Sequence, residues 1–131
     1  MPLQVRSLDH VTIVVKDLAA AQRFYVEALG MREVERPQFQ FAGQWFQAGA
    51  TQIHTILEAA GTGRVGAGQE RNTRGHHFAF LVDDAEAAWQ HVQDLGLTVV
   101  SPPRNRPDGA VQVFLHDPDG HLVELCSPPK K

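Results

Sequence analysis

The sequence predicts an α+β fold in which two βαβββ modules form a curved, partly open mixed β-barrel. First, a strand pattern that contains a leading histidine occurs twice, at residues 8–17 and 74–84. Second, an aspartate suited to a helix N-cap lies seven positions after that histidine in both copies, as Asp17 after His10 and as Asp84 after His77. Third, each helical pattern ends at a glycine and is followed by three strand patterns. The agreement of spacing, caps and composition favours duplication over chance.

The first module is predicted to cover residues 1–58. Its elements are a strand at 7–16, an amphipathic helix at 18–29 and strands at 31–36, 39–47 and 51–58. Asp17 caps the helix and Gly30 ends it, while Gly43 marks a kink or bulge in the third strand. Strand alternation assigns Val11, Ile13 and Val15 to the face that packs on the helix.

A glycine-rich linker over residues 59–74 leads to the second module, residues 75–131. The predicted elements are a strand at 77–82, a helix from the Asp84 cap to residue 95, and strands at 97–101, 110–116 and 121–126. Gly96 ends the helix, residues 102–109 form a loop, and Asp117-Pro118-Asp119-Gly120 is a β-turn. Phe78, Phe80 and Val82 correspond to the core-facing residues of the first module.

Composition excludes several classes of protein. The 131 residues are 43% hydrophobic and 21% charged, which is typical of one compact globular chain. A net charge of −3 argues against nucleic-acid binding and against a membrane-surface protein. Cys126 is the single cysteine, so no intrachain disulfide forms, and no long apolar run indicates a membrane span. We therefore expect a cytoplasmic protein.

Strand alternation also selects candidate site residues. His10 and His77 lie on the strand faces turned away from the helices, and so do His54 and Glu124 on the last strand of each module. Imidazoles and a carboxylate on rigid strands are ligands for a first-row divalent metal. The pattern therefore predicts a metal site with room for a substrate.

These motifs resemble the vicinal oxygen chelate superfamily, which contains glyoxalase I, extradiol dioxygenases and fosfomycin and bleomycin resistance proteins. The resemblance rests on residues 9–17, 23–25, 29–31, 77–84 and 117–125 and covers nearly the whole chain. It implies a glyoxalase/dioxygenase-like fold, a divalent metal ion (Zn, Ni, Mn or Fe) bound by His10, His54, His77 and Glu124, and a homodimer. Glyoxalase I has a glutamate where this chain has His54, so His54 is either a fourth ligand or the catalytic base, and Glu124 is the second residue expected in catalysis.

The leading hypothesis is a metal-dependent, glyoxalase-like lyase or isomerase acting on a small oxygenated substrate. An Fe(II) extradiol-type dioxygenase uses the same two histidines and one carboxylate, and a fosfomycin or bleomycin resistance-type protein is the third alternative.

Other residues receive simpler interpretations. Cys126 is expected to be a small buried residue near the site. The bulky residues Phe39, Phe41, Trp45 and Phe46 are assigned to the core, with a pocket wall as the alternative for Trp45. The arginines Arg71, Arg74, Arg104 and Arg106 are candidates for an anion clamp.

Overall fold

A computed structural model of the chain describes residues 3–62, 65 and 73–129. The chain divides into two compact units, Met1–Val65 and Gly66–Lys131, and each unit is described by itself. The predicted linker at residues 59–74 crosses this division, and its residues 63–64 and 66–72 lie outside the described part of the chain. The module boundaries at residues 58 and 75 remain a prediction.

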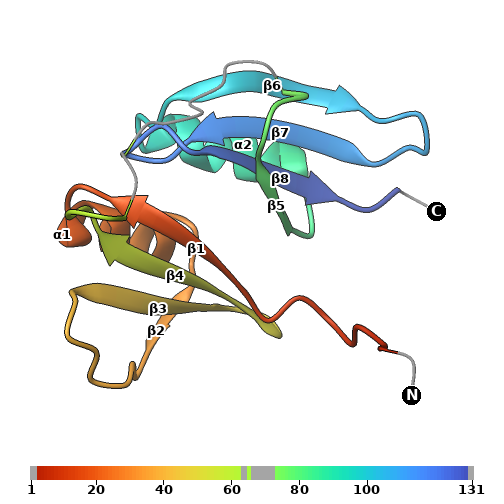
Figure 1. Cartoon of the computed structure of the whole chain (residues 1–131). Coiled ribbons are helices and arrows are strands. Elements are labelled where there is room, and N and C mark those ends of the chain that lie inside the picture. The colour runs from red at the N-terminus through yellow and green to blue at the C-terminus, as the bar shows by residue number, and fades with distance from the viewer. Residues whose placement is uncertain (1–2, 63–64, 66–72, 130–131) are drawn as a thin grey trace. The chain divides into compact units, whose positions relative to one another are not determined.

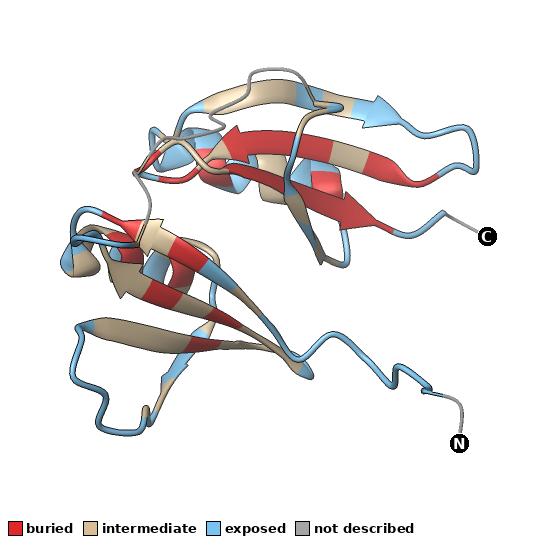
Figure 2. Ribbon diagram, in the orientation of Figure 1, coloured by how far each residue is buried: buried red, intermediate tan, exposed pale blue. Residues whose placement is uncertain are grey.

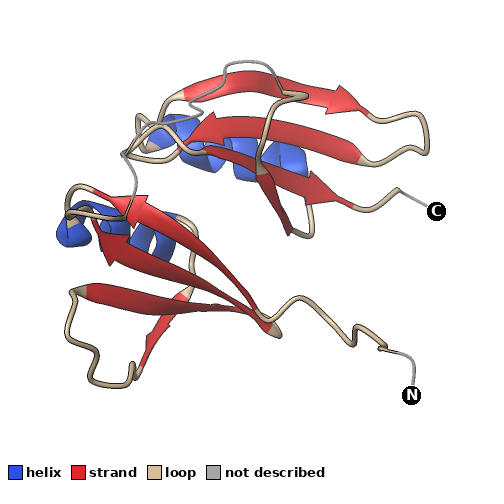
Figure 3. Cartoon of the chain, in the orientation of Figure 1, coloured by secondary structure: helices blue, strands red, loops and turns tan. Residues whose placement is uncertain are grey.

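Unit 1 contains a four-stranded mixed sheet with one helical segment against it (Figures 1 and 3). Its elements are β1 (His10–Val15), α1 (Leu18–Gln22), η1 (Arg23–Ala28), β2 (Arg32–Val34), β3 (Gly43–Ala48) and β4 (Thr51–Leu57). The strand order is β1-β4-β3-β2, in which β1 and β4 are parallel and the other neighbours are antiparallel. A parallel first pair needs a crossover, and the helical segment is part of it.

Unit 2 repeats this topology. Its elements are β5 (Phe78–Leu81), α2 (Ala85–Asp94), β6 (Val99–Asn105), β7 (Val111–His116) and β8 (Leu122–Ser127). The strand order β5-β8-β7-β6 again has a parallel first pair, and α2 contacts β6, β7 and β8. The α+β class and the βαβββ repeat are therefore confirmed, with an open sheet in each unit rather than a closed barrel among the described residues.

Both helices begin and end as predicted. Asp17 Oδ1 accepts hydrogen bonds from the amides of Ala19 and Ala20, and Asp84 Oδ1 accepts from those of Glu86 and Ala87. Gly96 has a φ of 72°, and two hydrogen bonds form a Schellman motif around it, Gly96 N–H to Gln93 O and Leu97 N–H to Val92 O. None of the described helices has the length and apolar character needed to cross a membrane.

Three elements differ from the prediction. The first helix changes to π-helical hydrogen bonding over η1, where the adjacent Phe24 and Tyr25 are both buried. β3 begins at Gly43 instead of residue 39. β6 extends through Pro102 and Pro103 to Asn105, a segment that the sequence indicated to be a loop. Prolines are tolerated there because β6 is an edge strand and its pairing with β7 shifts register on both sides of Ser101.

The core of each unit lies between its sheet and its helix, as the buried segments in Figure 2 indicate. Ile13 and Val15 are buried and Val11 is half-buried, so the predicted inner face of β1 is confirmed. Phe78 and Phe80 are only half-buried, because β5 is a short edge strand. Most of the buried apolar surface of unit 2 comes from β7 and β8 instead, including Val113, Leu115 and Val123.

Replacing Gly43 with Ala is expected to destabilise the chain by about 1–3 kcal/mol. A Cβ at this position would lie 2.2 Å from the backbone oxygen of Thr55 on β4, so β3 and β4 would have to separate. Urea unfolding measures the change. Gly30→Ala is the comparison, because its Cβ would meet no atom within 4 Å and its cost arises from the φ of 80° alone. A loss of less than about 1 kcal/mol in Gly43→Ala would contradict the steric explanation.

Candidate metal centre

The sheet of unit 1 presents one row of side chains on the face away from its helix. Thr12 on β1 pairs with His54 on β4, and His54 pairs with Trp45 on β3. The next row holds His10, Gln52 and Gln47. The predicted face of His10 and His54 is therefore the observed one, and it also carries Trp45.

His54 lies between two other rings. Its ring stacks on that of His10 at a centroid distance of 4.0 Å and an interplanar angle of 14°. On the other side it stacks on Trp45 at 4.2 Å and 4°. The lone pair of an imidazole nitrogen lies in the ring plane, so two nearly parallel stacked rings cannot both aim a lone pair at one ion. One of the two rings must turn if His10 and His54 are to bind the same metal.

Hydrogen bonds determine which nitrogen of each ring is available. His10 Nδ1 lies 2.8 Å from Asp9 Oδ2, so it carries the hydrogen and Nε2 keeps its lone pair. His54 Nε2 lies 2.7 Å from Gln52 Oε1, which leaves Nδ1 as the acceptor. Burial lowers the pKa of His54, and His10 and Arg36 lower it further, while Asp9 opposes them. The lowered pKa favours the neutral form of His54.

Unit 2 brings His77 and Glu124 together. His77 Nε2 is 3.0 Å from Glu124 Oε1, and His77 Nδ1 is 2.8 Å from the carbonyl oxygen of Gly75. The carbonyl only accepts, so Nδ1 carries the hydrogen, and the lone-pair direction of Nε2 points at a carboxylate oxygen. Two acceptors that face each other need a cation or a proton between them. The donor set, an imidazole nitrogen and a carboxylate oxygen, fits a first-row divalent metal.

The carboxylate of Glu124 is held on both sides. Its side chain is 6% exposed, and Gln112 Nε2 on β7 donates to Oε2 at 3.0 Å. The side chain of His77 is 26% exposed and its ring meets the edge of Phe114 at 5.3 Å. A buried carboxylate without a cation is costly, so this arrangement also favours a ligand role.

The four predicted ligands thus lie as two pairs, one in each unit. Within the described residues, no group of three or more histidine, cysteine, aspartate or glutamate side chains is arranged to hold a metal ion. His76, which precedes His77, is exposed. Sequence reasoning did not identify Asp9, Gln52 or Gln112 as partners of the candidate ligands, although the alternation of β4 and β7 could have found the two glutamines.

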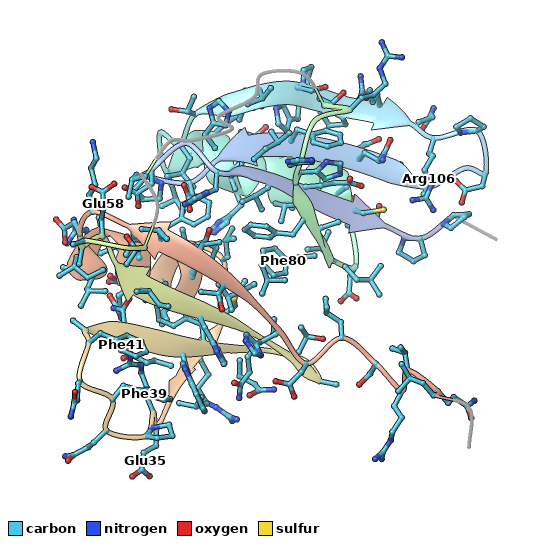
Figure 4. The ribbon with its side chains drawn as sticks, viewed as in Figure 1. Glu35, Phe39, Phe41, Glu58, Phe80 and Arg106 are labelled. Atoms are coloured by element: carbon cyan, nitrogen blue, oxygen red, sulfur yellow. The ribbon has the colours of Figure 1, made fainter. Side chains whose placement is uncertain are left out.

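The predicted aromatic core of unit 1 is partly wrong. Phe46 is fully buried, but Phe39 and Phe41 are 45% and 48% exposed because they precede β3 in a loop (Figure 4). They stack on each other at 5.0 Å, and the guanidinium of Arg36 lies over both rings. Trp45 is half-buried on the face of His54, which agrees with the alternative role of a pocket wall.

Two of the arginines proposed for an anion clamp, Arg104 and Arg106, have partners of their own. Arg106 forms two hydrogen bonds with Asp108, which raise the pKa of Arg106 and lower that of Asp108 to about 2. Arg104 lies over the Phe114 ring and donates to Thr73. Arg74 is exposed, and Arg71 lies outside the described residues. Arg106 is therefore engaged within its own hairpin (Figure 4).

Cys126 is expected to react with iodoacetamide at least about tenfold more slowly in the native chain than in the urea-unfolded chain. The residue is 9% exposed, and burial together with the nearby Glu124 raises the pKa of its thiol, so little thiolate is present near neutral pH. Mass spectrometry of alkylation against time measures both rates. Equal rates would contradict this account.

Comparison with known proteins links the chain to one superfamily. The profile of the Glyoxalase/Bleomycin resistance protein/Dioxygenase superfamily matches residues 7–125. The chain is 27% identical over 130 residues to Glyoxylase I 4 of Arabidopsis thaliana, across 96% of this chain and 73% of the relative. It is 28% identical over 122 residues to lactoylglutathione lyase of Salmonella typhi, across 90% of each chain.

Two further similarities add a curated relative and a solved structure. The chain is 29% identical over 121 residues to glutathione transferase FosA of Serratia marcescens, across 92% of this chain and 80% of the relative. Among solved structures, a glyoxalase family protein from Bacillus anthracis matches with a TM-score of 0.77 and 25% identity, covering 97% of this chain and 98% of the other. These similarities agree with the fold described above.

Proposed function

The chain belongs to the Glyoxalase/Bleomycin resistance protein/Dioxygenase superfamily, and on that premise we propose that it is a metal-dependent lyase or isomerase. Its substrate is a small molecule with two neighbouring oxygens. The site residues are His10, His77 and Glu124 as metal ligands and His54 as a fourth ligand or as the catalytic base. A homodimer and a cytoplasmic location are further parts of the proposal.

The observation that supports this proposal most directly is the contact between His77 and Glu124. The 3.0 Å approach requires a cation or a proton between Nε2 and Oε1, since the hydrogen on His77 Nδ1 is already donated to Gly75. Gln112 donates to the other carboxylate oxygen and so keeps Oε1 directed at His77. In unit 1, the hydrogen bond to Asp9 places the hydrogen of His10 on Nδ1, so the lone pair lies on Nε2 here as well.

The stacking of His54 between His10 and Trp45 favours the base over the fourth ligand. A bound divalent metal would supply Lewis-acid stabilisation of negative charge that develops on substrate oxygen. His10, His77 and Glu124 would hold that metal and leave positions open for the substrate. His54, neutral and with Nδ1 as acceptor, would take the proton from substrate carbon and return it, while Trp45 keeps its ring from turning.

An activity panel on metal-loaded protein tests the proposal. The panel contains the hemithioacetal of methylglyoxal and glutathione, fosfomycin with a thiol, and a catechol, each with Zn, Ni, Mn or Fe(II). Turnover of the hemithioacetal, lost on chelation and restored by the metal, is the expected result. Absence of turnover with all metals, or turnover that chelators do not affect, would overturn it.

A second candidate is thiol transfer to fosfomycin, favoured by the similarity to glutathione transferase FosA. Fosfomycin also offers neighbouring oxygens to a metal held by two histidines and a glutamate. Thiol-dependent loss of fosfomycin in the panel, without turnover of the hemithioacetal, would favour this candidate. Oxygen consumption with a catechol and Fe(II) would instead indicate the dioxygenase alternative.

A further inference from the structure

We propose that Gln47 and Gln52 are positioning residues that hold the hydrogen of His54 on Nε2 and make Nδ1 the atom that accepts a proton. The inference deepens the proposed function, since it identifies the reactive atom of the proposed base. It concerns only residues of unit 1, and the position of the hydrogen is a property that the metal-free chain already has.

The direction of the hydrogen bonds begins at the backbone. The carbonyl oxygen of Gly49 has no hydrogen to donate, so the Gln47 atom 2.6 Å from it is the amide nitrogen. Gln47 Oε1 is then directed at Gln52 and accepts from its amide nitrogen at 2.8 Å. Gln52 Oε1 is left for His54 Nε2, at 2.7 Å. An amide oxygen only accepts, so Nε2 must donate.

Regular strand geometry maintains this series of hydrogen bonds from Gly49 to His54. Gln47 and Gln52 are directly paired residues of β3 and β4, and Gly49 lies in the turn that joins the two strands. Gln52 and His54 are two positions apart on β4, so their side chains share one face. The stacked rings of His10 and Trp45 restrict rotation of the His54 ring away from Gln52.

This series of hydrogen bonds determines which nitrogen of His54 exchanges the proton. When Nδ1 of His54 takes a proton, Nε2 keeps its hydrogen bond to Gln52, and an amide oxygen is far too weak a base to remove that hydrogen. The proton therefore leaves from the same nitrogen that accepted it. A base that takes and returns a proton at one atom suits an isomerisation, in which the substrate proton moves between neighbouring carbons.

Two substitutions of Gln47 test the inference without changing Gln52 or His54. In Gln47→Glu the carboxylate still accepts from the Gln52 amide nitrogen, so Gln52 keeps its orientation. In Gln47→Lys the ammonium donates to Gly49 and to Gln52, so Gln52 turns and its amide nitrogen faces His54. The ¹⁵N chemical shifts of the His54 ring, measured on metal-free protein in mildly alkaline buffer, report which nitrogen carries the hydrogen.

Wild type and Gln47→Glu are expected to carry the hydrogen on Nε2, and Gln47→Lys on Nδ1. On a substrate from the panel, Gln47→Lys is expected to lower kcat by about 100-fold with KM nearly unchanged, since the acceptor is lost but binding is not. If the hydrogen remains on Nε2 in Gln47→Lys, or if it lies on Nδ1 in wild type, the inference is wrong. Failure of the panel with the predicted ¹⁵N shifts intact would overturn the proposed function and leave the tautomer assignment standing.

Discussion

Replacing Glu124 with Gln is expected to weaken divalent-metal binding by more than about 100-fold, because loss of a ligand exceeds the 10–100-fold that loss of an outer partner causes. The substitution keeps the size of the side chain but removes the negative charge from a residue that is 4% exposed. A neutral amide then faces His77 and has no charge with which to hold a cation. Calorimetric titration of chelator-treated protein, together with elemental analysis after dialysis, measures the effect.

Two further variants make the result specific. Glu33→Gln makes the same chemical change on an exposed position of β2 and is expected to leave metal binding unchanged. Gln112→Met removes only the hydrogen bond to Glu124 Oε2 and is expected to cause an intermediate loss of about 10–100-fold. Unaltered metal stoichiometry and affinity in Glu124→Gln would remove Glu124 from the site.

Replacing His54 with Gln is expected to lower kcat by about 10²–10⁴-fold while metal binding is retained. The stack with His10 at 4.0 Å and 14° leaves the two rings without a common point at which both lone pairs meet. The substitution is therefore expected to remove the proposed base and not a ligand. Steady-state kinetics and elemental analysis of the same preparation separate the two roles.

His10→Gln is the matched comparison, because it changes the neighbouring ring of the same stack. It is expected to lose metal and activity together. His76→Gln changes an exposed histidine and controls for the loss of an imidazole as such. Loss of metal from His54→Gln to the same extent as from His10→Gln would instead make His54 the fourth ligand.

Local patterns predicted the elements of this fold because the determinants are local. Asp17, Asp84 and Gly96 act within one helical turn, and the alternation of β1 depends on neighbouring residues alone. The prolines of β6 show the limit of this reasoning. Pro102 and Pro103 indicate a loop when the position of a strand in its sheet is unknown, but an edge strand with shifted register accommodates them.

For the candidate site, local patterns likewise predicted which strand faces carry the candidate residues. Alternation assigned His10, His54 and Glu124 to the correct strand faces, and the duplication related His77 to His10. Alternation could also have placed Gln52 and Gln112 on these faces, but the contact of Gln112 with Glu124 depends on the antiparallel register of β7 and β8, which the sequence alone does not give. The same limit applies to the aromatic residues before β3, where the pattern alone does not show that Phe39 and Phe41 lie outside the strand.

The two prolines of β6 also interrupt the backbone donors along one edge of the unit 2 sheet. Successive amides of a strand point to opposite sides, so one proline removes a donor that would face β7 and the other removes a donor that would face outward. An incoming strand from another molecule therefore meets an interrupted row of partners along β6. The opposite edge, β5, is four residues long and has no proline, and it exposes 78% of Leu81. Intermolecular strand pairing of unfolding intermediates through this sheet would therefore begin at β5. A single charged residue in place of Leu81 would oppose that pairing.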